Sequence, residues 1–428
     1  MAVTGRVPLL LLLGLVPVAF RPAMGTVGIW LLVVLALVLL DWLLAPRPET
    51  LTFERAPVGA VRMGYPTSTR LTVTASRRVT GLVRDAWQPS AGATGNRHRV
   101  SLRADEREVL LTPLRPTRRG DLRAVGVTVR TRGPLGLAAR QRTADVPGSV
   151  RSLPPFESRK HLPSRLARLR ELDGRSAVRI RGQGTEFDSL REYVRGDDVR
   201  SIDWRASARS RNVVVRTWQP ERDRRVVLVL DTSRTSAARV DDTPRLDSAM
   251  DAALLLAALA ARAGDRVDFV AGDRTIRAQV RAAGHRSIAA TLQDAMADLE
   301  PVIAEADWSA IAGSVSSLGR QRALVVLLTP LESAPVEEGL LPVLPTLTQR
   351  HRVVLASVKD PALEALARDR STVDEVYGAA AAEQVLLRRT RTARLLGALG
   401  VDIVDADAQR LPPALADHYL HLKASGLL

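Results

Sequence analysis

The stretch VVLVLDTSRTS, residues 226–236, decides the fold of the C-terminal half of this chain. Five apolar residues lead directly into Asp231, and an unbroken apolar run of this kind predicts a strand buried on both faces. Ser233 and Thr235 follow at every second position, so one carboxylate and two hydroxyls lie on a turn just past the strand. Hard divalent cations such as Mg²⁺ prefer oxygen ligands of this type. The stretch therefore predicts a buried strand with a candidate metal site at its end.

Strand and helix patterns alternate outward from this stretch through the segment 225–428. Such alternation indicates a doubly wound α/β sheet, and ligands on these sheets bind at the carboxyl ends of the strands. Asp231 stands at such an end. The predicted elements after 226–231 are a helix over 245–264, a strand pair over 266–273 and 275–281, a helix over 287–301, strands over 322–330 and 351–360, a helix over 374–400 and a strand over 401–407.

The N-terminal segment 1–47 is predicted to insert into a membrane. It holds two apolar runs, 7–20 and 26–45, separated by RPAMG. A spanning helix needs about 20 apolar residues, and the second run is long enough. The first is either a signal-peptide core or the first arm of a helical hairpin. We favour the hairpin, with transmembrane helices at about 7–22 and 25–45, because the second run follows almost at once.

Arginine positions predict the orientation of these helices. The loop between the two runs offers only Arg21, whereas many arginines follow the second run. The positive-inside rule then places the large C-terminal part in the cytoplasm of a multi-pass protein of the cell membrane. The same side chains are also suited to anionic lipid headgroups. These arginines are Arg47, Arg55, Arg62, Arg70, Arg77 and Arg78.

Composition limits the chemistry that the chain can perform. It has 428 residues and a formal charge of +16, but only three of its 62 basic residues are lysines. No nucleic-acid-binding motif accompanies the charge, so we expect a lipid bilayer and proteins as partners and no nucleic acid. The absence of cysteine excludes disulfides, thiolate zinc sites and a cysteine nucleophile. Neither a P-loop nor a G-x-S-x-G elbow is present.

The segment 48–152 is predicted to form a small β-sandwich. Its short stretches alternate apolar and polar residues and are divided by Gly, Pro and Ser. Two further stretches, 118–122 and 132–140, have the composition of turns. The predicted strands are 70–76, 98–104, 108–114 and 123–131.

A dense polar block, 184–218, lies in the segment 153–224 that links the two predicted folded parts. Its pattern is G-x-E-F-x-x-L-R-E-Y-x-x-G-D-D-x-R-x-I-D-W-x-A-S-A-R, a long and specific signature. With this block, the chain resembles the bacterial "domain of unknown function 58" family of membrane proteins. The domain that follows resembles a von Willebrand factor A fold. The principal signature residues are Gly184, Glu186, Phe187, Leu190, Arg191, Tyr193, Gly196, Asp197, Asp198, Arg200, Asp203, Trp204 and Arg209.

The resemblance implies a membrane-anchored scaffold or adaptor whose cytoplasmic A-type domain binds a protein partner. Members of the family are often encoded beside MoxR-type AAA+ ATPases and transglutaminase-like membrane proteins, so these are the expected partners, in envelope or complex-assembly work. No enzymatic activity is established for the family, and we expect none here. Two alternatives stay open: a metal-dependent hydrolase that uses Asp231, and a basic structural protein of the membrane surface.

Physically, the signature block interleaves arginines and carboxylates around apolar anchors. Arginine pairs well with carboxylates in bidentate geometry. We therefore expect a salt-bridge network that fixes the segment onto the A-type domain, with SLREYV, 189–194, as a helix. A partner-docking surface is the second interpretation. A catalytic cluster is the third, although the block contains no histidine.

The A-type resemblance also implies what a complete metal site would need: a threonine from a second loop and an aspartate after a later strand. Pro330 stands where that aspartate is expected, with Glu332 two residues on. Ser287 is the nearest candidate for the second-loop hydroxyl, because Thr291 falls within a predicted helix. We therefore expect at most a partial Mg²⁺ site at Asp231, Ser233 and Thr235. His418 and His421 have the spacing of a helical metal pair but no third ligand, which favours an ordinary helix face.

Overall fold

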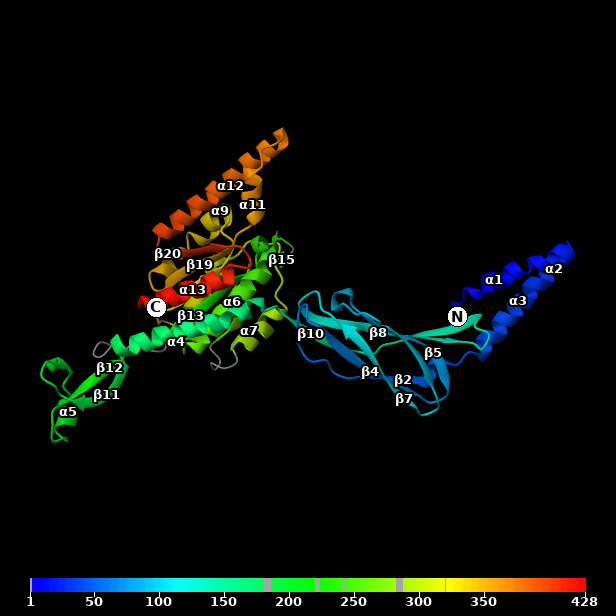
Figure 1. Ribbon diagram of the computed structural model, residues 1–428, viewed down its shortest axis with the longest axis horizontal. Helices are drawn as coiled ribbons and strands as arrows, with labels where there is room; N and C mark the ends of the chain where they lie inside the picture. Colours follow the sequence, from blue (N-terminus) through cyan, green and yellow to red (C-terminus); the bar gives the residue numbers. More distant parts are fainter. Residues whose placement is uncertain (1, 180–185, 220–223, 242, 282–287, 320) are drawn as a thin grey trace. The chain divides into compact units, whose positions relative to one another are not determined.

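The computed structural model describes residues 2–179, 186–219, 224–241, 243–281, 288–319 and 321–428, with the backbone alone at 173–179, 186–189 and 217–219. The chain divides into two compact units, Met1–Leu153 and Pro154–Leu428. The first runs from blue to cyan in Figure 1 and the second from green to red. Below they are the N-terminal unit and the C-terminal unit.

Three apolar helices open the N-terminal unit: α1 (Arg6–Leu13), α2 (Leu15–Phe20) and α3 (Met24–Leu44). Among the described residues, α3 is the one helix long and apolar enough to cross a membrane. The α1–α2 stretch is apolar but shorter. It lies beside α3, where the Trp30 Nε1–H donates to the Leu10 carbonyl oxygen at 3.1 Å (Figure 1).

Two β-sheets form the rest of this unit. A three-stranded sheet has the order β2-β4-β7, and a seven-stranded sheet has the path β1-β9-β8-β10-β3, with β5 beside β8 and β6 beside β5. Leu71 and Val73 of the first sheet share a core with Val83 and Val129 of the second. The strands are β1 (Ala2–Val3), β2 (Leu51–Arg55), β3 (Val61–Arg62), β4 (Thr67–Ala75), β5 (Val79–Trp87), β6 (Arg97–Leu102), β7 (Arg107–Leu114), β8 (Gly120–Arg132), β9 (Ala138–Ala144) and β10 (Ser149–Leu153), with short 3₁₀ turns η1 (Pro48–Thr50) and η2 (Pro89–Ala91).

The four strands predicted for this unit are present as β4, β6, β7 and β8, but several others were not predicted. The predicted turns over 118–122 and 132–140 are both partly wrong, because β8 spans Gly120–Arg132 and β9 begins at Ala138. The reason is pairing: Ala139 and Arg140 lie opposite Arg132 and Thr131 of β8. A cross-strand partner supplies the hydrogen bonds that local composition does not reveal.

The C-terminal unit is built on one six-stranded sheet of order β17-β16-β13-β18-β19-β20. Only β17 runs antiparallel to its neighbour. The strand that carries the opening stretch, β13, is central, and the predicted doubly wound sheet with a hairpin after Gly272 is confirmed. The strands are β13 (Arg225–Asp231), β16 (Arg266–Gly272), β17 (Ile276–Val280), β18 (Leu324–Leu328), β19 (Arg352–Val358) and β20 (Val401–Ala406).

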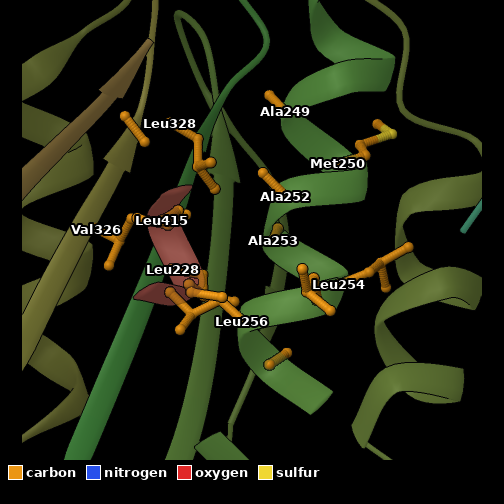
Figure 2. Close-up of a cluster of buried hydrophobic side chains, with 14 of the residues drawn as sticks. Leu228, Ala249, Met250, Ala252, Ala253, Leu254, Leu256, Val326, Leu328 and Leu415 are labelled. Atoms are coloured by element: carbon orange, nitrogen blue, oxygen red, sulfur yellow. The ribbon is translucent and has the colours of Figure 1, made fainter. Parts of the chain in front are cut away.

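Helices cover both faces of this sheet. Leu228 and Leu230 belong to the hydrophobic cluster on one face, and Val227 and Val229 belong to the cluster on the other. Both faces of β13 are therefore buried, which explains its unbroken apolar sequence. Figure 2 shows the first cluster, where Ala252 and Leu256 of α6 meet the sheet and Leu415 of α13. This face carries α4 (Leu162–Arg179), α6 (Arg245–Arg262), α7 (Ile288–Ala297) and α13 (Leu411–Ala424), with η3 (Glu157–His161).

The opposite face was less completely predicted. Its helix α8 (Trp308–Leu318) was not predicted, although Asp307 marks its start in the sequence. The Asp307 side chain is the N-cap and accepts the Ala310 N–H at 2.9 Å. The predicted helix over 374–400 is α12 (Val373–Ala398). The remaining elements of the unit are β14 (Arg239–Val240), β15 (Thr243–Pro244), the turn η5 (Arg234–Ala237), α9 (Ser333–Pro335), the π-turn η6 (Val336–Leu340), α10 (Leu344–Thr348) and α11 (Pro361–Arg368).

The signature segment forms a hairpin of its own. β11 (Glu186–Glu192) pairs antiparallel with β12 (Val214–Gln219), and between them lie η4 (Val199–Ser201) and the single-turn α5 (Trp204–Ser207). The predicted helix over 189–194 is therefore wrong. Leu190 and Arg191 lie opposite Arg216 and Val215, and pairing with a β-branched strand overrides the local helical pattern.

Candidate functional site at the carboxyl edge of the sheet

Asp231 lies at the carboxyl end of β13 and is surrounded by hydrogen-bond donors. Its Oδ1 accepts the Ser233 backbone N–H at 2.8 Å. Its Oδ2 accepts the hydroxyls of Thr329 at 2.7 Å and Thr235 at 3.2 Å. The Ser233 and Thr235 hydroxyls are themselves 3.1 Å apart. The predicted trio is thus brought together, and Thr329 joins it from the end of β18.

These side chains are almost entirely removed from solvent. Asp231 is 2% exposed, and Ser233 and Thr235 are also buried. Burial raises the pKa of Asp231, while the hydrogen bonds from Thr329 and from Ser233 act in the opposite direction. The carboxylate is therefore costly to ionise alone, and an added cation nearby would favour its charged form.

A second buried carboxylate fixes the loop after β13. The Thr232 hydroxyl donates to Asp273 Oδ2 at 2.8 Å, and the Thr232 N–H donates to the Gly272 carbonyl at 2.9 Å. The Thr232 carbonyl accepts the Val302 N–H at 2.8 Å. The loop is held from two sides, so the oxygens at Asp231 sit on a rigid support.

A cavity of about 220 Å³ opens above Asp231. Its floor is formed by Asp231, Ser233 and Thr329, and its rim carries Glu338 and the ion pair of Arg234 with Glu305. Such a pocket, with an oxygen-rich floor and charges at its mouth, suits a cation or a charged side chain of a partner. The remaining lining residues are Ala306, Trp308, Ala334, Pro335, Val336 and Gly339.

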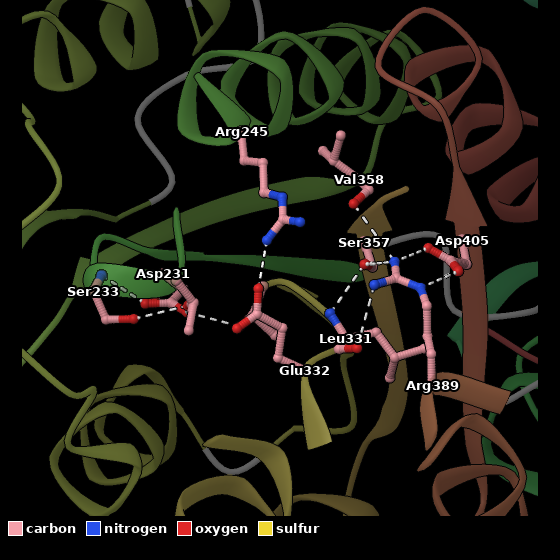
Figure 3. A network of polar contacts seen from close by, with 11 residues as sticks. Asp231, Ser233, Arg245, Leu331, Glu332, Ser357, Val358, Arg389 and Asp405 are labelled. Atoms are coloured by element: carbon pink, nitrogen blue, oxygen red, sulfur yellow. Dashed lines mark hydrogen bonds and ion pairs between the residues drawn. The ribbon is translucent and has the colours of Figure 1, made fainter. Parts of the chain in front are cut away.

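Thr329 is the functional residue that sequence reasoning missed. Pro330 and Glu332 were the positions considered for the missing carboxylate, but the Glu332 carboxylate pairs with Arg245 at 2.5 Å (Figure 3). Ser287 lies outside the described residues, and Thr291 is in α7. The only signal for Thr329 was its position directly after a buried strand. Among the described residues, no group of three or more His, Cys, Asp or Glu side chains is placed to hold a metal.

An arginine links the pocket loop to the far edge of the sheet. Arg389 of α12 pairs with Asp405 of β20 through Nε at 2.9 Å and Nη2 at 2.5 Å. It also donates to the Ser357 hydroxyl at 2.7 Å and to the Leu331 carbonyl at 3.3 Å. Figure 3 shows this guanidinium between three segments that end at the same edge. Leu331 is two residues from Thr329, so the network supports the floor of the pocket.

Ion pairs form within the signature hairpin. Arg191 binds Asp197 with two hydrogen bonds of 2.8 and 2.5 Å, and Arg216 binds Asp203 at 2.7 Å. The hydrogen bond from Arg191 lowers the pKa of Asp197. For the described side chains, these ion pairs close within the hairpin and do not join it to the sheet. The expected network exists, but it stabilises the hairpin itself.

Several apolar side chains of the hairpin face solvent, whereas Ile202 is half-buried. Trp204 is 67% exposed, and Val194 and Val199 are each 61% exposed. Leu190 and Tyr193 are also exposed, whereas Arg200 and Arg209 form the polar surroundings. Exposed apolar side chains gathered on a small element mark an interaction surface. Gly184 lies outside the described residues, the side chains of Glu186 and Phe187 are not described, and Gly196 has a positive φ of 115° at the turn. Asp198 caps η4 by accepting the Arg200 N–H at 3.0 Å.

The histidine pair is not a metal centre in the described geometry. His418 Nε2 lies 3.2 Å from Asp402 Oδ2, and the same carboxylate pairs with Arg352 at 2.7 Å. His421 is exposed on α13. The two side chains thus have separate structural surroundings, as an ordinary helix face has.

The chain is similar to one protein family and to parts of several solved structures. Residues 189–395 match the family described as "Protein of unknown function DUF58". The VWA domain of SpRpn10 is 10% identical, with a TM-score of 0.28, and the match covers 46% of this chain and 94% of that one. The hypothetical protein BatB from Bacteroides thetaiotaomicron is 14% identical, with a TM-score of 0.28 and coverage of 46% and 98%. The ASH/PapD-like domain of human CEP192 is 11% identical, with a TM-score of 0.18 and coverage of 25% and 89%.

No curated protein matches the chain. The strand order of the C-terminal unit, with one antiparallel edge strand, carries the fold assignment. The predicted von Willebrand factor A-like domain is confirmed.

Proposed function

We propose that this chain, which belongs to the DUF58 family through residues 189–395, is a membrane-anchored scaffold or adaptor that binds a partner protein. The observation that carries the proposal is the signature hairpin. Two of its arginines, Arg191 and Arg216, pair with carboxylates of the same hairpin, while Trp204 and its apolar neighbours are exposed. Exposed tryptophan is the residue type that most often dominates binding energy at interfaces.

The family resemblance supports a MoxR-type AAA+ ATPase as the partner, with a transglutaminase-like membrane protein as a further member of the assembly. The test is co-purification of the full chain with such an ATPase, in magnesium, followed by titration of the Trp204→Ala variant. We expect at least tenfold weaker binding, since a central aromatic contributes about 2 kcal/mol or more. Tyr377→Ala is the matched control, because Tyr377 is 74% exposed on α12. Equal affinity of both variants and wild type would remove the hairpin from the interface.

The membrane part of the proposal rests on α3 and on the arginine asymmetry around it. We propose that α1 and α2 cross the bilayer beside α3, so that the β-sheets of the N-terminal unit and the whole C-terminal unit lie in the cytoplasm. Because the chain has no cysteine, single cysteines report topology cleanly. An Ala23→Cys thiol should react with an impermeant reagent from outside the cell, and an Arg103→Cys thiol should not. The reverse labelling pattern contradicts the orientation.

We propose no catalytic role for Asp231. Its two oxygens are already engaged by hydrogen bonds from Ser233, Thr235 and Thr329. The residues do fit a weak Mg²⁺ site of one carboxylate and three hydroxyls, short of the two or more carboxylates that hard cations usually recruit. Calorimetric Mg²⁺ titration of the full chain against Asp231→Ala tests it: identical heats leave Asp231 a loop-capping residue.

A further inference from the structure

The end of α3 is clamped by a turn of the N-terminal unit. Asp41, which is fully buried, accepts the backbone N–H groups of Leu135, Leu137 and Ala138, each at 2.7 Å. Glycine at 133 permits this approach, because a Cβ there would lie 2.2 Å from Asp41 Oδ1. The turn between β8 and β9 and the last turns of α3 are therefore one rigid piece.

We call the contacts of Asp41 with residues 135–138 the clamp. The clamp fixes how far the sheets of the N-terminal unit lie from a bilayer that α3 crosses. α3 has 21 residues, which gives a length of about 31 Å, close to the roughly 30 Å hydrocarbon core. Asp41 lies less than one turn from its end. The Thr131 hydroxyl donates to the Pro46 carbonyl at 2.6 Å, so the end of β8 lies just beyond the helix. In a bilayer crossed by α3, this end of the unit lies among the headgroups.

Hydrogen bonds bring two more loops to the same end. The Ser76 N–H donates to the Thr50 carbonyl, six residues after α3, at 2.9 Å, and Gly81 near the start of β5 lies opposite Thr131 near the end of β8. The Asp105 N–H donates to the Ala75 carbonyl at 2.7 Å. The loop between β4 and β5 and the loop between β6 and β7 therefore share the level of the clamp.

Exposed arginines gather at this level. Arg6 is one of them, and it donates to the Leu135 carbonyl at 3.1 Å. None of the five arginines named at the end of this paragraph forms an ion pair within the part of the chain that the structure describes. Arg140 lies over the Trp42 ring at 4.6 Å, a pairing typical of the interface. Glu49, Asp105 and Glu106 are the acidic residues of the same loops. We call the following five exposed side chains the arginine collar: Arg6, Arg47, Arg77, Arg78 and Arg132.

We propose that the arginine collar binds the phosphate groups of anionic phospholipids in the leaflet next to the N-terminal unit. The inference rests on the proposed membrane anchoring and goes beyond it, because it assigns a lipid-binding surface to named residues. Guanidinium groups suit phosphate, and unpaired arginines at a membrane surface attract anionic lipid. The rigid clamp holds the collar at the depth where those phosphates lie.

The test uses the full chain in neutral detergent, titrated with phosphatidylglycerol or phosphatidylcholine and followed by native mass spectrometry. Wild type should prefer phosphatidylglycerol, and salt should weaken the preference. About fivefold of affinity per arginine predicts at least a tenfold loss for Arg47→Gln/Arg77→Gln/Arg78→Gln. The charge-matched control is Arg97→Gln/Arg99→Gln/Arg123→Gln, which changes exposed arginines on β6 and β8 outside the collar.

Equal affinity of wild type for the two lipids overturns the proposal, and so does an equal loss in the control variant. Carbonate extraction of membranes that hold wild type separates this failure from failure of the anchoring itself. A chain that resists extraction but shows no lipid preference refutes the collar alone. A chain released by carbonate refutes the anchoring.

Discussion

Replacing Arg389 by methionine should loosen the far edge of the sheet and the floor of the pocket together. The substitution keeps the aliphatic stem and removes the guanidinium that pairs with Asp405 and binds Ser357 and Leu331. The side chains of Arg389 and Asp405 are 10% and 22% exposed. Removing one partner of a buried pair costs about 3–5 kcal/mol. Because Asp405 keeps some contact with water, we take the lower value, about 3 kcal/mol.

Hydrogen exchange on the full chain measures this loss locally. At about 1.4 kcal/mol per tenfold, amides of β20 and of the loop after β18 should exchange roughly 100-fold faster in Arg389→Met, whereas those of the N-terminal unit should not change. Arg388→Met is the matched control, since Arg388 is exposed on the same helix. The double variant Arg389→Met/Asp405→Leu should recover most of the protection, because it removes both charges. The reasoning is refuted if exchange in β20 changes less than threefold, or changes equally in the control.

Two further predictions concern the buried carboxylates of the C-terminal unit. Burial raises the pKa of Asp251 from 3.8 to about 6, although hydrogen bonds from Ser158 act to lower it. Between these pH values the native state binds more protons than the unfolded state, so the free energy of unfolding should fall by up to about 3 kcal/mol as the pH rises through this window. Melting temperatures measured against pH should show this decrease in wild type and a flatter profile in Asp251→Asn. Thr329→Asp puts a second carboxylate at the position from which the Thr329 hydroxyl now reaches Asp231 Oδ2 at 2.7 Å. Like-charge repulsion should lower the melting temperature without metal, and Mg²⁺ should restore it. A melting temperature independent of Mg²⁺ would show that the pocket floor does not admit the ion.

The sheet of the C-terminal unit could be predicted because its sequence carries the constraint at every residue. Residues 226–230 of β13 are buried on both faces and are all apolar, and the apolar run stops at Asp231, where the strand ends. The signature hairpin could not be predicted in the same way. Its two strands pair across the intervening segment 193–213, which holds turns and short helices. The prediction for SLREYV therefore rested on local pattern alone, which favours a helix. Its exposed apolar anchors satisfy no core, and such residues are ambiguous from sequence.

The site shows the same division. Asp231, Ser233 and Thr235 were found because all three lie in one stretch, and a single turn brings them together. Thr329 was missed because its contribution depends on the parallel pairing of β13 with β18, which aligns Leu230 with Leu328. The position where an aspartate was expected holds Pro330, yet the chain supplies a hydroxyl one residue earlier. The sequence shows that the expected aspartate is absent at Pro330, but only the register of β13 with β18 shows that the Thr329 hydroxyl takes its place beside Asp231.

The hydroxyl of Thr329 in place of a second carboxylate affects how a partner protein and Mg²⁺ would bind at the pocket. With one buried carboxylate and three hydroxyls, the floor carries too little charge to hold Mg²⁺ firmly in isolation. A carboxylate from a docking protein would complete the set, so metal and partner would each raise the affinity of the other by the same factor. In our proposal the hairpin supplies the apolar contact and the pocket supplies this conditional one. Partner affinity should then depend on Mg²⁺ in wild type and lose that dependence in Asp231→Asn, while the effect of Trp204→Ala should be the same with or without the metal. An Mg²⁺ dependence that survives Asp231→Asn would place the ion elsewhere in the complex.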